Sequence, residues 1–504
     1  MANLLYDALF GRHIGQKTPF LHMPDGHVIS HDDFIRSAAR YANTLVGLGS
    51  EAGDRIAVHI NKSPDALALY AACVQAGLVF LPLNPAYTAA EMEYFVVNSG
   101  ARLLVCDPAD HDAMEKVARR ATVRLETMDA TGRGSLRDLA QLQSGDFTTV
   151  DRGPDDLAAL LYTSGTTGRS KGAMLSHQNL LSNAQTLGDV WRFTKADVLL
   201  HALPIFHTHG LFVATNIMLL AGGAMIFMPR FDVDQLIRLM PRATALMGVP
   251  TFYTRLLASD DFTAGLTAHM RLFISGSAPL LAETHTQFEE RTGHRILERY
   301  GMTETNMTTS NPYDGPRRAG TVGTPLPDVE LKICDPDTGT TLPDGDTGMI
   351  EVRGPGVFQG YWHMPEKTAA ELRSDGFFIT GDLGLIDDQG YVHIVGRDKD
   401  LIISGGYNIY PKEIELVLDT QPGVLESAVI GVPHPDLGEA PLGVLVPDGS
   451  VDLDLDAIAG TIGQHLARFK CPRLLVLAQD LPRNAMGKVQ KNLLRAQYAS
   501  AFAP

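Results

Sequence analysis

Hydroxyl side chains, glycines and a lysine are concentrated between Tyr162 and Gly172 of this chain. Glycine tolerates positive φ, so successive backbone N–H groups of such a loop can converge on an anion. The hydroxyls and the lysine add further donors and one positive charge. The residues concerned are Thr163, Ser164, Gly165, Thr166, Thr167, Gly168 and Lys171. This composition predicts a phosphate-binding loop, although a flexible turn can share it, and the spacing is not that of the Walker A loop.

Further side chains that can hold a nucleotide or a cation follow in separate short motifs. Tyr300 opens the run Tyr-Gly-Met-Thr-Glu, in which the ring can stack on a base and the carboxylate of Glu304 can hold Mg²⁺, a cation that prefers oxygen ligands. Asp382 stands between glycines and can accept hydrogen bonds from a ribose, which Arg397 can also reach. Lys488 follows a glycine in a short loop. Each of these motifs alone is a weak signal.

Two histidines and an arginine are candidates for a second, adjacent site. His207 and His209 stand beside a glycine and could bind a metal, but no third ligand of a suitable type is nearby. A metal site is therefore disfavoured, and a buried histidine that bonds backbone groups is the alternative. Arg255 follows a predicted strand end at Val249 and could enter the crevice at the carboxyl end of an open sheet. The small-residue turn from Ser275 to Ala278 leaves room for a flat ring near the backbone.

The elements that must position these residues alternate between helix and strand patterns. Within residues 1–150, an amphipathic helix begins near Asp32, a strand begins at Arg55, and a helix opens at Ser63. Such alternation predicts an α/β sheet with helices on its faces. Residues 320–396 carry short strands and turn signals, which predict a mostly β segment.

Composition limits the classes of function. Lys+Arg 42 against Asp+Glu 58 gives a net charge of −16, and an acidic protein is a poor candidate for nonspecific binding to nucleic acid or to an anionic membrane. The 4 cysteines lie far apart, which fits reduced thiols in the cytoplasm and gives no metal signature. No basic segment followed by an apolar one opens the chain, so no signal peptide is predicted. The apolar segment Leu211–Met228 is broken by two adjacent glycines, which favours a buried helix, a turn and a strand over a membrane span.

Taken in order, the motifs from Thr163 to Lys488 resemble those of the adenylate-forming superfamily, which includes acyl-CoA synthetases, luciferases and peptide-synthetase adenylation domains. The resemblance implies an α/β fold with a large N-terminal domain of two α/β subdomains and a β subdomain, and a small mobile α+β C-terminal domain. We expect the large domain at residues 1–396, a hinge at 397–400 and the small domain at 401–504. The active site is expected in the cleft between the domains.

The same resemblance assigns roles to individual residues. ATP, Mg²⁺ and coenzyme A are the implied ligands, and the acid forms an acyl-adenylate before its transfer to the thiol of coenzyme A. Lys399 is implied as the hinge residue, and Thr167 and Glu304 as the Mg²⁺ ligands. The implied catalytic residues are Thr163, Lys171, His207, Glu304 and Lys488. The implied nucleotide- and coenzyme-binding residues are Thr163, Ser164, Gly165, Thr166, Thr167, Gly168, Lys171, Ser277, Ala278, Glu298, Tyr300, Gly301, Met302, Thr303, Asp382, Arg397, Lys399, Ser404, Gly405, Gly406, Tyr407 and Lys488.

Within the superfamily, the compact chain, the His-Thr-His-Gly segment and the stretch from Gly248 to Arg255 are similar to malonyl-CoA synthetases. This likeness implies malonate, and also methylmalonate, as the acid. A second carboxylate inside a protein needs a paired cation, and the planar guanidinium of Arg255 suits it bidentately, with Arg230 in reserve. A salt bridge at the surface is the alternative role of Arg255. The implied acid-binding residues are His207, Arg255, Ser277 and Met302.

Other functions stay open on the sequence alone. A ligase for a medium-chain or aryl acid is expected to lack a cation in the acyl site, and a ligase for a carrier protein would act on a partner's thiol. A non-catalytic binding protein would not need both Glu304 and Lys488. The lysine at position 488 is also of a type that is reversibly acetylated in the superfamily. A lysine acetyltransferase is therefore an expected partner besides the small-molecule substrates, and loss of the charge is expected to stop adenylation.

Overall fold

The computed structural model describes residues 3–163, 170–404, 407–435, 437–466, 468, 470–484 and 487–502, and only the backbone of 407, 408, 438, 464 and 465. The chain divides into two compact units, one of Met1–Glu330 with Val352–Phe378 and one of Leu331–Glu351 with Ile379–Pro504. The predicted hinge at 397–400 lies within the second of these units, and the predicted domain boundaries stay a prediction.

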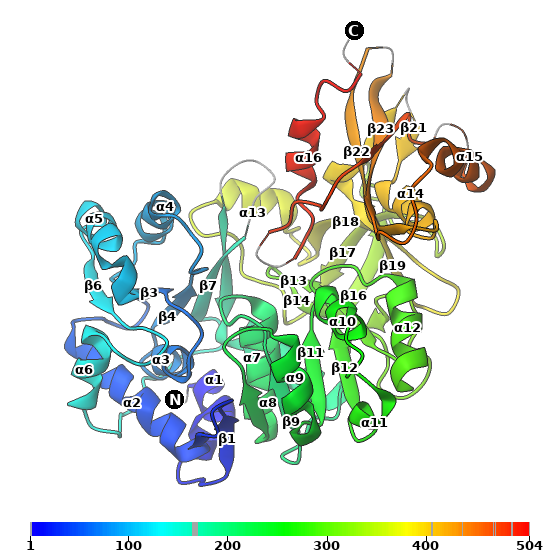
Figure 1. Cartoon of the computed structure of the whole chain (residues 1–504). Coiled ribbons are helices and arrows are strands. Elements are labelled where there is room, and N and C mark those ends of the chain that lie inside the picture. The colour runs from blue at the N-terminus through cyan, green and yellow to red at the C-terminus, as the bar shows by residue number, and fades with distance from the viewer. Residues whose placement is uncertain are drawn as a thin grey trace. The chain divides into compact units, whose positions relative to one another are not determined.

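The first unit contains a six-stranded sheet that is parallel except at one edge (Figure 1). In the described residues the strand order is β6-β5-β3-β4-β7-β8, and only β8 runs antiparallel to its neighbour. The strands are β3 (Arg55–His59), β4 (Val79–Pro82), β5 (Leu103–Cys106), β6 (Arg124–Thr127), β7 (Leu157–Thr163) and β8 (Lys171–Ser176). Central strands are buried on both faces, which explains their continuous apolar runs.

A second sheet, of nine strands, positions most of the predicted site residues. Its order is β15-β14-β13-β12-β11-β9-β10-β1-β2, parallel from β13 to β1 and antiparallel at both edges. The strands are β1 (Pro19–His22), β2 (Val28–Ser30), β9 (Val198–His201), β10 (Ala224–Phe227), β11 (Ala245–Gly248), β12 (Leu272–Ser275), β13 (Leu297–Met302), β14 (Asn306–Ser310) and β15 (Thr324–Pro325). Carboxyl ends of parallel strands meet at one edge, so the segments after His201, Gly248 and Ser275 lie along the same side of the sheet.

Helix starts follow the local signals in the sequence. Ser30 caps α2 (His31–Gly47), Ser63 caps α3 (Pro64–Gln75), and Ser176 caps α7 (His177–Val190) through the backbone N–H three residues on. The helices predicted near Asp32 and at Ser63 are confirmed. The other helices described in the first unit are α1 (Leu4–Leu9), α4 (Ala89–Ser99), α5 (His111–Ala121), α6 (Ser135–Gln141), α8 (Asn216–Ala221), α9 (Val233–Leu239), α10 (Pro250–Leu257), α11 (Ala264–Thr267), α12 (Ala282–Thr292) and α13 (Pro365–Glu371).

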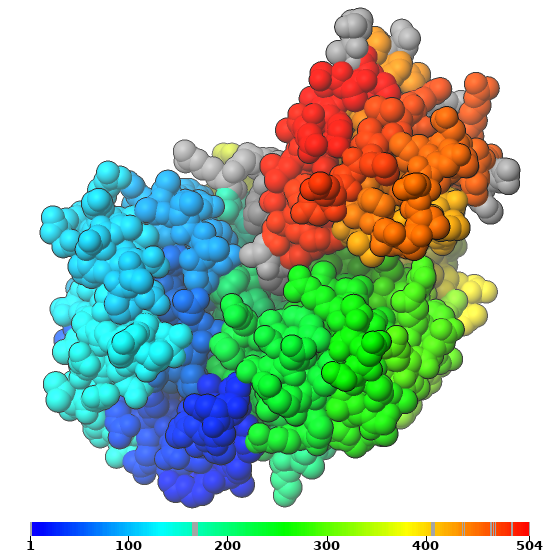
Figure 2. All heavy atoms as spheres, in the orientation of Figure 1, coloured from blue at the N-terminus to red at the C-terminus, as the bar shows by residue number. Residues whose placement is uncertain are grey.

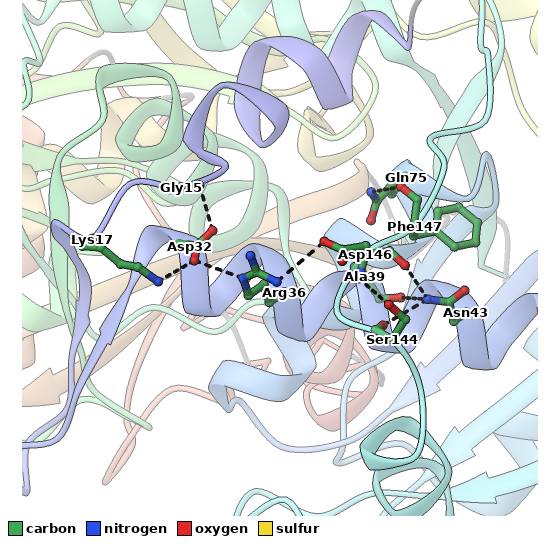
Figure 3. A network of polar contacts seen from close by, with 10 residues as sticks. All are labelled: Gly15, Lys17, Asp32, Arg36, Ala39, Asn43, Gln75, Ser144, Asp146 and Phe147. Carbon is green, nitrogen blue, oxygen red and sulfur yellow. Dashed lines mark hydrogen bonds and ion pairs between the residues drawn. The ribbon is translucent and has the colours of Figure 1, made fainter.

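The acidic first turn of α2 fastens this helix to the segment before it (Figure 3). The carboxylate of Asp32 accepts hydrogen bonds from Nζ of Lys17 at 2.6 Å, from the backbone N–H of Gly15 at 2.8 Å and from Nε of Arg36 at 3.1 Å. The Lys17 hydrogen bond, with that of Gly15, holds the pKa of Asp32 well below its usual range. Arg36 in turn lies 3.6 Å from Asp146, so α2 also holds the chain that returns beside it.

The apolar segment Leu211–Met228 has the structure that the sequence predicted. A π-helical segment, His209–Thr215, continues into α8, which ends at Gly222, and β10 follows in the middle of the second sheet. Among the described residues, no helix combines the length and the hydropathy needed to cross a membrane. Figure 2 shows the N-terminal residues, in dark blue, against green residues from the middle of the chain, as the pairing of β1 with β10 requires.

The second unit is built on short strands and a compact mixed sheet. One sheet has four described strands in the order β16 (Glu330–Cys334), β17 (Gly348–Arg353), β18 (Phe378–Ile386) and β19 (Val392–Arg397). Most residues of this sheet belong to the second unit. This confirms the predicted β segment. The other sheet, of five described strands, has the order β21-β20-β23-β22, and β24 pairs with β23. Its elements are β20 (Ile402–Ser404), β21 (Tyr407–Ile409), β22 (Val424–His434), β23 (Gly438–Pro447) and β24 (Leu474–Leu477), with α14 (Pro411–Leu418), α15 (Leu455–His465) and α16 (Lys491–Gln497).

Alternation along β22 gives this sheet two buried faces. Val429 packs with residues of α14 and α15 on one face. Its neighbours Ala428 and Ile430 pack with Leu494 of α16 on the other. The period of two residues in a strand produces this division, so the C-terminal residues form an α+β unit with its own core.

Candidate functional site

The predicted phosphate loop joins two antiparallel neighbours of the six-stranded sheet. Thr163 is the last residue of β7, Lys171 is the first of β8, and the two are paired in register. The hairpin therefore fixes both ends of the loop. The predicted phosphate-binding residues Ser164, Gly165, Thr166, Thr167 and Gly168 lie outside the described residues.

The predicted cation ligand Glu304 lies in the tight connection between β13 and β14. At Gly301 a Cβ atom would lie 2.1 Å from the carbonyl oxygen of Asn306, so only glycine allows this close approach. Glu304 is 4% exposed, and its Oε1 accepts hydrogen bonds from the hydroxyl of Thr163 at 3.3 Å and from that of Tyr361 at 3.1 Å. The fold thus brings the phosphate-loop hairpin and the Tyr-Gly-Met-Thr-Glu motif together.

Two residues that the sequence did not indicate, Tyr361 and Glu371, join Glu304 to Lys171. The hydroxyl of Tyr361 lies 2.7 Å from Oε2 of Glu371. Nζ of Lys171 lies 3.3 Å from the same carboxylate and 4.1 Å from the centre of the Tyr361 ring. Lys367 also reaches Glu371, at 2.6 Å. Tyr361 therefore contacts Lys171 and two carboxylates, and both lysines reach the carboxylate of Glu371.

The acid–base balance of this cluster follows from the contacts. Burial raises the pKa of Tyr361 far above its usual value, and the two flanking carboxylates raise it further, so the phenol stays protonated and donates to one carboxylate at a time. Burial alone would raise the pKa of Glu371, but the hydrogen bonds from Lys367 and Tyr361 hold it below its usual value. We refer to Lys171, Glu304, Tyr361 and Glu371 as the phosphate-side cluster.

The residues around Glu304 fit a magnesium ion. Its buried carboxylate and the hydroxyl of Thr163 supply oxygen donors at the mouth of the loop, which is the donor chemistry that Mg²⁺ takes in nucleotide sites. Among the described residues, no group of three or more His, Cys, Asp or Glu side chains forms a metal site by itself. Such an ion would therefore take its remaining ligands from phosphate, from water or from Thr167.

On strand β13, Arg299 is a buried charged residue with no counter-ion in the part of the chain that the structure describes. It is 2% exposed, and its Nε and Nη2 have no hydrogen-bond partner among the described residues. Burial lowers its pKa to about 9. Its guanidinium lies directly against Gly276, where a Cβ atom would come within 2.4 Å of Cζ. The guanidinium thus lies beneath the turn from Ser275 to Ala278, which the sequence singled out.

The same turn holds one of the paired histidines. Ser277 adopts a left-handed conformation with φ 73, and its hydroxyl lies 3.2 Å from Nδ1 of His209. A non-glycine residue in this region is strained, and such strain is often found at functional sites. Burial lowers the pKa of His209 far below its usual value, and the charge of Arg299 lowers it further, so His209 is neutral. We refer to Arg299, His209, Ser275 and Ser277 as the acid-side cluster.

The other predicted residues of the acid site lie in different surroundings. His207 and Met302 are half-buried, on the turn after β9 and at the end of β13. Arg255 lies in the last turn of α10 and is exposed, as is Arg230. The role of Arg255 as the cation that contacts the acid stays a prediction.

Several predicted nucleotide- and coenzyme-binding residues belong to the second unit. Asp382 on β18 and Arg397 on β19 are paired in register, with Nε 2.7 Å from Oδ1. Lys399 is exposed within the turn Asp398–Asp400. Ser404 ends β20 and is buried, whereas Gly405 and Gly406 lie outside the described residues and only the backbone of Tyr407 is described.

The predicted adenylation lysine lies in a short, closed loop. Arg483 and Val489 form a bridge, and the side chain of Asn484 accepts a hydrogen bond from the backbone N–H of Lys488 at 3.0 Å. Gly487 supplies the positive φ of 75 that the loop needs. The backbone of Lys488 is therefore held while its side chain is exposed.

Two family models match the chain. The model of the AMP-binding enzymes matches residues 13–362, and that of the AMP-binding enzyme C-terminal domain matches 413–488. The chain belongs to the family of AMP-binding enzymes. The predicted superfamily and α/β fold class are thereby confirmed, and so is the prediction of an enzyme rather than a non-catalytic binding protein.

Individual relatives of this AMP-binding enzyme differ in the acid that their names give. The malonate–CoA ligase of Arabidopsis thaliana is 35% identical over 89% of this chain and 79% of the relative. A feruloyl-CoA synthase of an Amycolatopsis species is also 35% identical, over 94% of each chain. The crystal structure of ATP-bound MatB from Rhodopseudomonas palustris matches with a TM-score of 0.98 and 56% identity, over 100% of both chains.

The sequence patterns missed the residues that complete the two clusters. Arg299 could have been noticed, because it is a charged residue inside the strand Leu297–Met302, between the predicted site residues Glu298 and Tyr300. Tyr361 and Glu371 carry no comparable signal, since their partners Glu304 and Lys171 lie far away in the sequence.

Proposed function

We propose that this chain is an ATP-dependent malonate–CoA ligase that also accepts methylmalonate. Malonate and ATP give malonyl-adenylate and pyrophosphate, and coenzyme A then gives malonyl-CoA and AMP. The names of relatives alone do not choose the acid, because a malonate ligase and a feruloyl-CoA synthase are equally similar to the chain. The observation that favours a short diacid is the buried guanidinium of Arg299, whose Nε and Nη2 find no hydrogen-bond partner in the described part of the chain.

A second carboxylate is the partner that this guanidinium requires. An isolated buried charge is costly, and a carboxylate can pair with the planar guanidinium through two parallel hydrogen bonds. Ser277, His209 and the glycine at position 276 surround the same point. An aryl or fatty chain would leave the charge without a partner. Arg299 is thus a stronger candidate than the exposed Arg255 for the residue that contacts the second carboxylate of the acid.

Adenylation requires positioning and charge neutralisation rather than a general base, because a carboxylate is a sufficient nucleophile. The acid carboxylate attacks the α-phosphorus of ATP, the bond to the bridging oxygen breaks, and pyrophosphate leaves. Lys171, the hydroxyls of the loop and Lys488 would compensate the phosphate charge. Mg²⁺, held by Glu304 and Thr167, would supply further neutralisation when bound. Asp382 and Arg397 would hold the ribose, and Tyr300 the base.

Thioester formation would use a second set of residues. We assign the large domain to residues 1–396, the hinge to 397–400 with Lys399, and the small domain to 401–504. Rotation at the hinge would withdraw Lys488 after the first step and present the segment from Ser404 to Tyr407 to coenzyme A. Acetylation of Lys488 by a lysine acetyltransferase would then block adenylation and spare thioester formation from supplied malonyl-adenylate. The 4 cysteines are free thiols, which suits the cytoplasm.

The proposal is tested by acid-dependent exchange of pyrophosphate into ATP, with malonate, methylmalonate, succinate, acetate, octanoate and benzoate. The wild type is compared with Arg299→Met and with Arg255→Ala. We expect the wild type to catalyse exchange with the short diacids. This exchange should be lost in Arg299→Met and kept in Arg255→Ala. Exchange with benzoate or octanoate but not with malonate would overturn the substrate. Loss in Arg255→Ala alone would return the role to Arg255.

A further inference from the structure

Lys62 is a buried lysine without a carboxylate partner among the described residues. It stands between β3 and α3 and is 9% exposed. Its Nζ lies 2.7 Å from Nδ1 of His201, 2.8 Å from the carbonyl oxygen of His201 and 2.9 Å from that of Leu203. The centre of the Phe227 ring lies 4.3 Å away. Lys62 belongs to none of the sequence motifs, and the adenylation chemistry does not use it.

The hydrogen-bond geometry identifies the protonation state of the pair. Nε2 of His201 lies 2.8 Å from the carbonyl oxygen of Gly210, so Nε2 carries the proton and Nδ1 is an acceptor. An ammonium group has three N–H donors and faces three acceptors here, whereas a neutral amine would leave one acceptor unmet. Burial lowers the pKa of Lys62, and burial together with the charge of Lys62 lowers that of His201. The pair thus holds one positive charge, located on Lys62.

These bonds close the turn formed by residues 202–209 at both ends. Lys62 binds the carbonyls of His201 and Leu203 where the turn begins, and His201 binds the carbonyl of Gly210 where it ends. The hydroxyl of Thr215 donates to the same Gly210 carbonyl at 3.0 Å. One ammonium group, directly and through His201, therefore fixes both ends of the turn.

The two ends of the turn are also in direct contact. At Gly210 a Cβ atom would lie 2.0 Å from the carbonyl oxygen of Pro204, so no other residue fits. The turn carries His207 and His209, and His209 reaches Ser277 of the acid-side cluster. A displacement of the turn would move both histidines relative to the guanidinium of Arg299.

We propose that Lys62 is a positioning residue for acid binding, whose ammonium group holds the turn of residues 202–209 in the conformation that places His207 and His209 beside the acid. The proposal rests on the proposed function only in the choice of acid. The three donors of Lys62 are taken up by His201 and Leu203, so its removal is expected to change acid binding through the turn while the phosphate-side cluster stays intact.

The test compares Lys62→Met with a matched control in the same buried region. Methionine has a similar length and lacks both the charge and the donors. Tyr70→Phe on α3 removes one buried hydrogen bond, to Asn216 at 3.3 Å, without touching the turn. The KM for the acid, the KM for ATP and kcat are measured by pyrophosphate exchange, and folding is followed by thermal unfolding. Lys62→Gln keeps two donors without the charge and serves if Lys62→Met does not fold.

The expected result is a rise of about tenfold or more in the KM for malonate in Lys62→Met, with the KM for ATP unchanged and with neither value changed in Tyr70→Phe. Equal rises in both KM values, or a fall in kcat alone, would overturn the positioning role, because a general loss of structure acts on both substrates. An unchanged KM for the acid would overturn it as well. If the wild type shows no exchange with malonate, the proposed function fails, and the same comparison is made with whichever acid supports exchange.

Discussion

The phosphate-side and acid-side clusters of the first unit differ in how their charges are balanced. On the phosphate side, Lys171 has a carboxylate partner, and the hydroxyl of Tyr361 lies within hydrogen-bond distance of two carboxylates and donates to one of them at a time. On the acid side, Arg299 is a buried cation without a carboxylate partner in the described residues, as is Lys62 beside the turn that carries His209. The first cluster contains its own counter-charges, whereas the second leaves a positive charge for which the acid is the natural partner.

This difference predicts opposite responses to mutation. A cluster whose charges are paired internally keeps its geometry without a ligand. When a phosphate binds, the cation of such a cluster must leave its carboxylate partner. A buried cation without a partner destabilises the folded state, and its ligand recovers that cost on binding. The unpaired charge on the acid side is therefore expected to lower the stability of the ligand-free protein and to strengthen acid binding, whereas the paired charges on the phosphate side are not.

The largest effect is expected for Arg299→Met. Loss of a buried charge that pairs with a bound carboxylate costs about 2–5 kcal/mol of binding, or roughly 30-fold to several thousand-fold in kcat/KM for malonate. The ligand-free variant should at the same time unfold at a higher temperature, because an apolar side chain replaces an unpaired buried charge. Steady-state kinetics and calorimetry of the same preparation measure both. A lower melting temperature together with an unchanged kcat/KM would contradict the assignment.

The pH dependence should separate the clusters next. The protonated form of Arg299 binds the acid, and its pKa is about 9, so the KM for malonate should be constant below that pH and rise about tenfold per pH unit above it. The KM for ATP should not rise near pH 9. Arg299→Met is the control, in which the dependence near pH 9 disappears. A midpoint that persists in this variant would assign the titration to another group.

A smaller and opposite effect is expected for Glu371→Gln on the phosphate side. The change removes the internal carboxylate that Lys171 must leave to reach a phosphate. Partly exposed ion pairs contribute about 1 kcal/mol or less, so the KM for ATP should fall by roughly threefold to fivefold, with the KM for malonate unchanged. Lys367→Met tests the alternative that Glu371 acts through Lys367, and it should leave the KM for ATP unchanged. A rise in the KM for ATP in Glu371→Gln would show that the pair organises the loop instead of competing for it.

The smallest effect is expected for Tyr361→Phe. The ring beneath Lys171 remains, and only the hydroxyl that donates to Glu304 and Glu371 is lost. A hydrogen bond to a charged group contributes about 1.5–3 kcal/mol to stability, and part of that loss should be visible as a lower melting temperature. In kinetics we expect a modest rise in the KM for ATP and no change for malonate. An equal change for both substrates would contradict the separation of the clusters.

Local chemistry was sufficient to predict the elements that carry the site. The amphipathic pattern predicted the start of α2 near Asp32, Ser63 and the proline after it predicted that of α3, and a pair of glycines predicted the break within Leu211–Met228. The order of motifs predicted the superfamily, and the ends of the phosphate loop at Thr163 and Lys171 pair as a hairpin. Each of these features depends on neighbours within a few residues, which the sequence displays directly.

The choice between cations could not be made from the sequence. Arg255 lies in the helix that follows β11, Arg299 lies within β13 of the same sheet, and both stand in stretches that carry predicted site residues. The fold leaves Arg255 on the exposed side of α10, whereas Arg299 is enclosed beneath Gly276. Exposure is a property of all the elements packed around a side chain, so no local pattern specifies it.

The sequence by itself determined the helices, the strands, the family and the groups available for chemistry, because capping, periodicity and motif spacing are local. Only the tertiary structure decided which charges have partners. Lys171 and Glu371 are 200 residues apart, and Lys62 and His201 are 139 residues apart. The free energy of a buried charge depends on the counter-charges and hydrogen bonds that distant segments bring to it. Pairing on the phosphate side and its absence on the acid side are therefore consequences of packing.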